Sequence, residues 1–248
     1  MNYSDTDGTI HKRSGWLIPL AVFLITFAFS ALFLLFYLAP SAPNFQLEQV
    51  APTARTDKIA LRVHGLHLWI PANYLEHESA RSGGARADIA LFTVLPALVG
   101  WSPVDAPLFS GNAPDSPVVY LLIRNEAVNL SEADRLSRIY IAYVGNPRGQ
   151  PGPFGLTQFA FRENSGYGRE DLFVGQSGSG PIVLRCVRFS PEVPSPSCLR
   201  DLPVAHGVAL SYRFKRAHLA KWREIASGID NLIAKFEKAP PAADQPKQ

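Results

Sequence analysis

The sequence is poor in cysteine and in net charge, and both shortages narrow the possible function. It has two cysteines among 248 residues, and its formal net charge is +3. Its lysines and arginines are spread along the chain, whereas nucleic-acid-binding proteins concentrate them in runs or patches. A structural zinc site needs about four closely spaced ligands, and the cysteines have no such neighbours. We therefore expect no nucleic-acid partner and no cofactor.

One stretch lacks charge altogether. The run WLIPLAVFLITFAFSALFLLFYL, from Trp16 to Leu38, contains no acidic or basic residue. As a helix it would be about 35 Å long, enough to cross a hydrocarbon core of roughly 30 Å. Trp16 and Tyr37 stand near its ends, where aromatic rings favour the membrane–water interface. We predict a transmembrane helix over residues 15–38, which contacts the lipid bilayer through residues 16–38 and has Trp16 and Leu38 as its ends.

The charges around this helix predict its orientation. Lys12 and Arg13 precede it, and no lysine or arginine follows it before Arg55. Because positive residues favour the cytoplasmic side, residues 1–14 are expected in the cytoplasm and the C-terminus outside. In a bacterium, the protein would be a single-pass inner-membrane protein with a periplasmic domain. The apolar core of a cleaved signal peptide has only about 7–15 residues, so we expect an uncleaved signal-anchor.

Beyond the helix, the pattern predicts a linker, one domain and a tail. Prolines mark residues 39–56 as a linker, and residues 239–248 are expected to be disordered. Between them, residues 57–238 show apolar runs separated by proline and glycine, which is typical of strands and turns. Alternating residues around His64-Gly65 predict a hairpin over 58–70. Further strands are predicted at 88–95, 118–124, 154–162, 171–174, 181–189 and 208–214.

Two helices are predicted in this domain. Ser131 is a suitable N-cap, with Asp134 three residues later, and the following apolar spacing predicts a helix over 131–143. The alternative is a strand from Ile139 to Val144. A longer helix over 217–238 carries a wide apolar stripe, expected to pack on the domain's own sheet. The order of elements predicts an α+β fold, with a mainly antiparallel sheet and a long C-terminal amphipathic helix.

The two cysteines, Cys186 and Cys198, both follow the predicted helix. In an oxidising compartment they can form a disulfide bond. The segment 189–197 between them contains three prolines and predicts a stiff loop. Closing it would stabilise the fold by roughly 3 kcal/mol. The alternative is a pair of buried thiols.

One short motif suggests catalysis. The segment Gly175-Gln176-Ser177-Gly178-Ser179-Gly180-Pro181 resembles the GDSGGP nucleophile loop of trypsin-like serine proteases. Gln176 replaces the aspartate, Ser179 is inserted, and no TAAHC-like segment precedes it. A nucleophilic serine needs a histidine within hydrogen-bond reach, for which His206 and His218 are candidates. A turn between two strands explains the segment better, so no catalytic residue is assigned.

Other polar groups also have structural explanations. Histidines and carboxylates suit zinc or copper, and arginines around a Gly-Gly pair suit an anion. We expect the histidines to lie on the surface and the arginines to be solvated in a loop. Glu132 and Asp134 are explained by the favourable position of carboxylates at a helix N-terminus. Neighbouring strand residues point to opposite faces, so Glu170 and Asp171 should not act together. The remaining groups considered are His64, His67 and His77 with Glu76 and Glu78, and Arg81 and Arg86 around Gly83-Gly84.

The segment from Arg185 to Phe236, about a quarter of the chain, carries a recognisable pattern. It contains Arg185-Cys186, Cys198, a strand from Gly207 to Tyr212-Arg213-Phe214, and the spacing Leu219, Trp222, Ile225. With the opening GLHLWIPANY at 65–74, this pattern resembles periplasmic immunity proteins that protect bacteria against type VI secretion lipase effectors. The resemblance implies binding and blocking an effector, without catalysis. The chain also resembles uncharacterised single-pass bacterial inner-membrane proteins, which implies location but no activity.

We therefore expect a membrane-anchored protein whose periplasmic domain is a non-catalytic binding or accessory module with a protein partner. An immunity protein against a secreted effector is one alternative. A membrane-anchored hydrolase that uses Ser177 is another. A subunit of a transport or envelope complex, in which the anchor itself matters, is the third.

Overall fold

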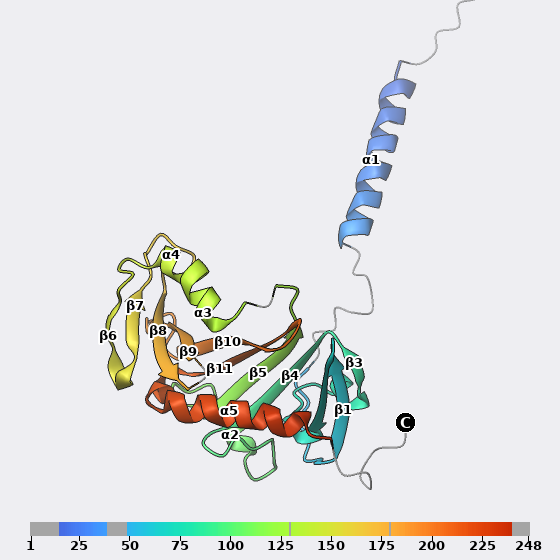
Figure 1. Cartoon of the computed structure of the whole chain (residues 1–248). Coiled ribbons are helices and arrows are strands. Elements are labelled where there is room, and N and C mark those ends of the chain that lie inside the picture. The colour runs from blue at the N-terminus through green and yellow to red at the C-terminus, as the bar shows by residue number, and fades with distance from the viewer. Residues whose placement is uncertain (1–14, 39–48, 129, 179, 240–248) are drawn as a thin grey trace, which may run out of the picture. The chain divides into compact units, whose positions relative to one another are not determined.

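The computed structural model describes residues 15–38, 49–128, 130–178 and 180–239 (Figure 1). The chain divides into two compact units between Gln49 and Val50. The predicted tail 1–14, most of the predicted linker and the residues beyond Ala239 lie outside the described residues.

The first unit contains the predicted apolar helix, α1 (Leu17–Leu38). Its segment Leu17–Leu34 is long and apolar enough to cross a membrane. The Thr26 hydroxyl donates to the Val22 carbonyl at 2.9 Å, so this polar group is satisfied within its own helix. The presence of an N-terminal apolar helix is therefore confirmed.

The second unit is built on an eight-stranded sheet in which all neighbouring strands are antiparallel. The predicted α+β fold is confirmed. In spatial order the strands are β4 (Asp88–Val94), β5 (Val118–Asn125), β11 (Val208–Lys215), β10 (Ser197–Ala205), β9 (Gly180–Val187), β8 (Glu170–Ser177), β7 (Thr157–Ala160) and β6 (Gln150–Pro151).

A small second sheet has the order β2-β1-β3. The predicted hairpin is present as β1 (Lys58–Val63) and β2 (Leu66–Pro71), followed by a 3₁₀ turn, η1 (Ala72–Tyr74). The arginines that the sequence analysis placed in a loop, Arg81 and Arg86, lie in a segment that is partly regular. This segment forms a 3₁₀ helix, η2 (Ser79–Ser82), and a short strand, β3 (Gly84–Arg86), that pairs parallel with β1. A three-residue strand is too short to show periodicity in the sequence.

The C-terminal helical segment covers one face of the large sheet. It begins as a 3₁₀ helix, η5 (Arg216–Lys221), and continues as α5 (Trp222–Glu237). In Figure 1, α5 lies across the large sheet and reaches the β1–β2 hairpin. The predicted stripe is buried in the main core, as expected for packing on the domain's own sheet. Its residues are Leu219, Trp222, Ile225, Ala226, Ile229, Leu232, Ile233 and Phe236.

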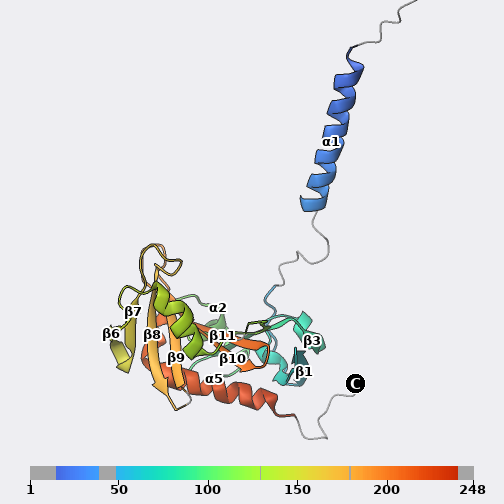
Figure 2. The ribbon, with the colours of Figure 1, turned by 45° about the horizontal axis from the view of Figure 1, so that its top comes forward.

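The second face of the sheet is covered only in part. The predicted helix over 131–143 is continuous but contains a π turn: α3 (Glu132–Arg135), η3 (Leu136–Tyr140) and α4 (Ile141–Tyr143). Ser131 caps it by accepting the Asp134 amide at 3.0 Å, as predicted. This segment packs over β8 and β9 in a second apolar cluster (Figure 2).

Near the other edge, a short helix, α2 (Ala106–Ser110), which the sequence analysis did not predict, packs on β4 and β5. The Phe109 ring meets the Phe92 ring edge-on at 4.9 Å. Helix α2 thus closes the β4 side of the second face, as the α3–α4 segment closes the β8 side.

Two strand predictions need correction. Strand β10 was not predicted, because Arg200, Asp201 and Pro203 interrupt the apolar pattern of its sequence. Strand β7 is shorter than predicted, because Pro153–Gly155 forms a 3₁₀ turn, η4, in which Phe154 has φ +58°. Strands β4, β5, β8, β9 and β11 lie where the pattern placed them.

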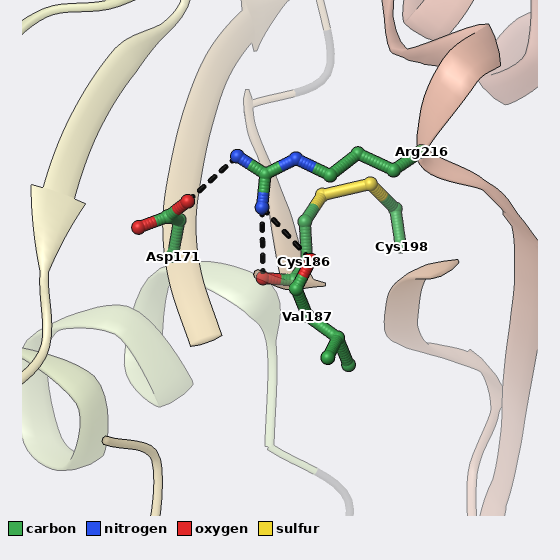
Figure 3. The surroundings of a disulfide bond; sticks show 5 residues. All are labelled: Asp171, Cys186, Val187, Cys198 and Arg216. Atoms are coloured by element: carbon green, nitrogen blue, oxygen red, sulfur yellow. Dashed lines mark hydrogen bonds and ion pairs between the residues drawn. A yellow bond between two sulfur atoms is a disulfide. The ribbon is translucent and has the colours of Figure 1, made fainter. Parts of the chain in front are cut away.

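The two cysteines face each other across β9 and β10, with their sulfur atoms at bonding distance, 1.98 Å. Figure 3 shows Arg216 beside them. Its guanidinium donates to the Val187 carbonyl at 2.9 Å and to an Asp171 carboxylate oxygen at 2.6 Å. The disulfide and this arginine therefore fasten β8, β9 and β10 to the start of the C-terminal helical segment.

We expect the Cys186→Ala, Cys198→Ala double variant to lower the free energy of unfolding by about 3 kcal/mol, because the unfolded chain gains loop entropy. Urea unfolding followed by circular dichroism measures this change. Reductant is the matched control: it should lower the stability of the wild-type protein to that of the variant, and leave the variant unchanged. Equal stability of oxidised wild type and variant would contradict the prediction.

Candidate interaction surface

A strip of the second sheet face lies between the α2 side and the α3–α4 segment. We define the open strip as Tyr120 and Leu122 on β5, Arg213 on β11, and Leu199 on β10. Ser211, two residues before Arg213 on β11, is buried. Arg213 is directly opposite Tyr120 on one side and Leu199 on the other. Since opposite residues in a ladder share a face, the tyrosine, arginine and leucine side chains form one row across three strands.

The row is accessible to solvent although it lies in the middle of the sheet. Tyr120 is 43% exposed, and the Arg213 side chain is also exposed. Within the part of the chain that the structure describes, the Arg213 side chain makes no ion pair or hydrogen bond. A small pocket of about 160 Å³ adjoins Tyr120, Arg213 and Lys215. The strip therefore combines an accessible aromatic ring, a guanidinium available to a ligand and a recess.

A row of alternating charges borders the strip. Neighbouring members approach within 3.0–3.9 Å, and their side chains are only 11–31% exposed. The Arg185 guanidinium also lies over the rings of Tyr140 and Tyr167, at 5.8 and 5.3 Å from their centroids. These contacts fix the charged groups before any partner arrives. The row runs through Arg135, Glu126, Arg124, Asp201, Arg185 and Glu170.

Beside this row, strands β9 and β10 separate. They pair only at Cys186–Cys198 and Arg185–Leu199. Glu132, the first residue of α3, occupies the gap. One of its carboxylate oxygens accepts the Val183 amide at 2.8 Å and Arg200 Nε at 2.9 Å, and the other accepts Arg200 Nη2 at 2.6 Å. A carboxylate thus replaces the carbonyl that a neighbouring strand would offer.

Arg200 lies deep in the core, with a side chain only 5% exposed. Burial alone lowers the pKa of Arg200, but its bonds to Glu132 and the surrounding charges raise it overall. Its Nη1 also donates to the Tyr212 hydroxyl at 3.2 Å. Burial raises the pKa of Tyr212 to about 12, so its phenol remains neutral at physiological pH. A pocket of about 390 Å³ opens beside this network, between α3 and α5.

The structure gives the protease-like segment a role in the fold. Ser177 ends β8, and its hydroxyl donates to the Gly180 carbonyl at 2.8 Å, which closes the β8–β9 turn as predicted. His218 follows β11 and lies at the opposite end of the sheet, with Nε2 3.0 Å from the Asp115 and Ser116 carbonyl oxygens. His206 lies beside His64, with ring centroids 6.5 Å apart. This geometry gives no support to a hydrolase that uses Ser177 with His218.

The loop arginines are likewise used in the fold. Among the described residues, no group of three or more histidine, cysteine or carboxylate side chains could hold a metal ion. Arg81 donates to the Leu75 and Ala51 carbonyls, and Arg86 donates to Ser79 and Ser82. The two guanidiniums therefore hold backbone together instead of gripping a free anion.

Glu170 and Asp171 point to opposite faces, as the strand pattern predicted. Glu170 pairs with Arg185 at 3.0 Å, whereas Asp171 accepts Arg216 and, at 2.9 Å, Arg188. Because the two carboxylates belong to different ion-pair networks on opposite faces, they cannot act together as a general acid and a general base.

Sequence reasoning missed two features of the surface. The open strip could not be identified, because Tyr120 lies within an apolar run and Arg213 within an alternating one. The partner of Glu132 was missed, since Arg200 is 68 residues away and its strand was not predicted. The only local signal was the Arg200-Asp201 pair inside an otherwise apolar segment.

Comparisons with known proteins show a similar fold but no sequence match. No protein-family model and no curated protein matches the sequence. Among solved structures, the chain is similar to an immunity protein of the Stenotrophomonas maltophilia type IV secretion system. The two share 18% sequence identity with a TM-score of 0.52, over 73% of this chain and 93% of that one. At this identity the likeness shows the fold alone, and it comes from a type IV system, whereas the sequence resemblance was to type VI immunity proteins.

We expect Glu132→Gln to lower the free energy of unfolding by about 3–5 kcal/mol, because it leaves the buried Arg200 charge without its counter-ion. Chemical unfolding monitored by tryptophan fluorescence measures the change. Glu224→Gln, on the exposed side of α5, is the matched control and should change stability by less than about 0.5 kcal/mol. Similar small effects of both substitutions would show that the ion pair does not hold the parted strands.

Proposed function

We propose that this chain is a membrane-anchored, non-catalytic binding protein that captures and blocks a secreted protein effector, as an immunity protein does. The observation that carries the proposal is the open strip, an accessible and preorganised surface on a fold similar to that of an immunity protein. The finer sequence resemblance, to immunity proteins against lipase effectors, suggests the first class of effector to test.

The chemistry of the strip suits a protein partner. Tyrosine and arginine are enriched among the residues that dominate protein–protein binding energy, because each offers a large contact area and directional donors. Tyr120 and Arg213 are neighbours on the strip, and the recess beside them can receive a partner side chain. The bordering charges are already paired, so they can discriminate between partners without reorganising.

The apolar helix α1 gives this binding protein a location. We propose that it is an uncleaved anchor in the bacterial inner membrane, with residues 1–14 in the cytoplasm and the domain in the periplasm. The absence of lysine and arginine between residues 14 and 54 supports this orientation. The disulfide between Cys186 and Cys198 suits an oxidising compartment. Anchoring would keep the inhibitor at the periplasmic surface of the inner membrane.

We expect Arg213→Ala to weaken capture of the partner by about tenfold or more, because the central arginine of an interface is a typical hot spot. The partner is first identified by crosslinking and co-purification of the full-length chain from its native membrane. Its affinity for the purified wild type, Arg213→Ala and Tyr120→Ala is then compared.

Arg138→Ala is the matched control, since Arg138 is an exposed arginine on the α3–α4 segment, away from the strip. It should bind the partner as the wild type does. In cells, co-expression of the wild type should restore growth to cells that express the partner, and Ser177→Ala should protect equally. Loss of protection on Ser177→Ala alone, with folding and binding intact, would favour the hydrolase alternative.

The proposed topology has its own test. Alkaline phosphatase is active only after export, so a fusion after Gln248 should be active and a fusion after Ser14 should be inactive. An N-terminal tag should remain on the protein in the membrane fraction, because we expect no cleavage. The reverse pattern of activity, or a soluble periplasmic form without the tag, would contradict the anchored orientation.

A further inference from the structure

A second recess lies away from the open strip, where the β1–β2 hairpin meets the C-terminal half of α5 (Figure 1). We call it the hairpin groove. Its volume is about 710 Å³, and its third wall is the segment 96–99 that follows β4. Grooves of a few hundred Å³ accommodate several side chains of a ligand.

Contacts within the fold fix the residues that line the hairpin groove. Leu98 has φ +51°, a conformation that non-glycine residues rarely adopt. Two contacts hold it there. The Tyr74 hydroxyl donates to its carbonyl at 3.0 Å, and its side chain packs onto Gly228 of α5, where an added Cβ would lie 2.7 Å from Leu98 Cδ1. The Tyr74 ring also meets Phe236 edge-on at 5.2 Å. The recess is therefore shaped before any ligand binds.

The groove combines an apolar floor with a basic rim. Trp69 and Pro71 on the hairpin are half-buried, and Leu232 and Phe236 of α5 lie beneath. The rim carries three exposed lysines, Lys58, Lys235 and Lys238, and no acidic residue among those that the structure describes lines the groove. Two carboxylates adjoin groove residues in the sequence. Asp57 is engaged by Arg55 at 2.7 Å, and Glu237 lines the pocket between α3 and α5 instead. The described part of the rim is therefore positively charged.

The position of α5 explains only part of this charge. Lysines in the last turn of a helix offset its dipole, which accounts for Lys235 and Lys238. The helix dipole does not account for Lys58, which lies on another element, or for the half-buried Trp69 ring. The Lys58 and Trp69 side chains share the outer face of the hairpin, and that face continues to the exposed Arg62. The positive surface therefore extends beyond the helix end.

We propose that the hairpin groove is a docking site for an acidic segment of a protein partner. Apolar side chains of the segment would enter between Trp69 and Phe236, while its carboxylates pair with Lys58 on one side and Lys235 and Lys238 on the other. The cations lie on two different elements, so they match several carboxylates along a chain better than a single phosphate group. The inference rests on the proposed function only in taking a protein as the class of partner.

The probe is a short fluorescein-labelled peptide that alternates aspartate or glutamate with leucine and phenylalanine. Its control is the same peptide with asparagine and glutamine at the acidic positions. Fluorescence anisotropy with the full-length chain in neutral detergent should show about tenfold tighter binding of the acidic peptide, since three lysine–carboxylate pairs contribute. Combining Lys58→Glu, Lys235→Glu and Lys238→Glu should abolish that preference.

Two charge-reversal substitutions away from the groove, Lys221→Glu and Arg138→Glu, are the matched controls. These variants should still bind the acidic peptide more tightly than the amide peptide. Should the triple reversal fail to fold, lysine-to-glutamine changes at the same three positions give the same comparison with less perturbation. Equal binding of the acidic and amide peptides would overturn the proposal. So would an equal loss in the control variants, which would indicate only a general charge effect.

Two further outcomes would assign the groove to another occupant and overturn the proposal. One is much tighter peptide binding by a chain that ends at Ala239, which would show that residues 240–248 fill the groove. The other is displacement of the peptide by phosphatidylglycerol vesicles but not by phosphatidylcholine vesicles, which would indicate an anionic lipid. Because the probe is not the effector, failure here leaves the effector-protection test of the proposed function unaffected.

Discussion

The buried ion pair between Glu132 and Arg200 determines how the domain is arranged around its sheet. A guanidinium in a protein core is tolerated only when its charge and its donors are satisfied. Arg200 meets that requirement through Glu132, the first residue of α3. The Glu132 carboxylate also accepts the Val183 amide at the point where β9 and β10 separate. The first turn of α3 is thereby held at this gap. The rest of the α3–α4 segment can then cover β8 and β9, but not β5, β11 and β10.

The open strip is a consequence of that placement. One sheet face must be covered by α5, since the helix itself carries a wide apolar stripe that has to be buried. The other face is covered at both sides and left accessible in the middle, where its side chains are mixed in character. A mixed face of this kind can remain in water without aggregating and can still offer an aromatic ring and an arginine to a partner. The open strip can therefore be exposed to water and also serve as the proposed binding surface.

Elements that depend on local pattern could be predicted from the sequence. Helix α1, the β1–β2 hairpin, the Ser131 cap and the stripe of α5 each follow from residues close to one another in the chain. What could not be predicted depends on distant pairing. Strand β10 is interrupted by Arg200 and Pro203, and its pairing with β11 and the bond from the distant Glu132 help to make that sequence stable as a strand. The open strip depends on which strands become neighbours, which no local pattern contains.

The protease-like segment shows how packing can produce the appearance of a catalytic motif. Gly175 is needed because the Trp222 ring of α5 lies against its backbone, and an added Cβ would come within 2.3 Å of the ring. Gly180 is needed because its φ is +128° at the turn into β9. Between these two constraints, Ser177 closes the turn through its hydroxyl. Gly175, Ser177 and Gly180, which suggested a nucleophile loop, therefore each have a separate structural cause in the packing of α5 and in the β8–β9 turn.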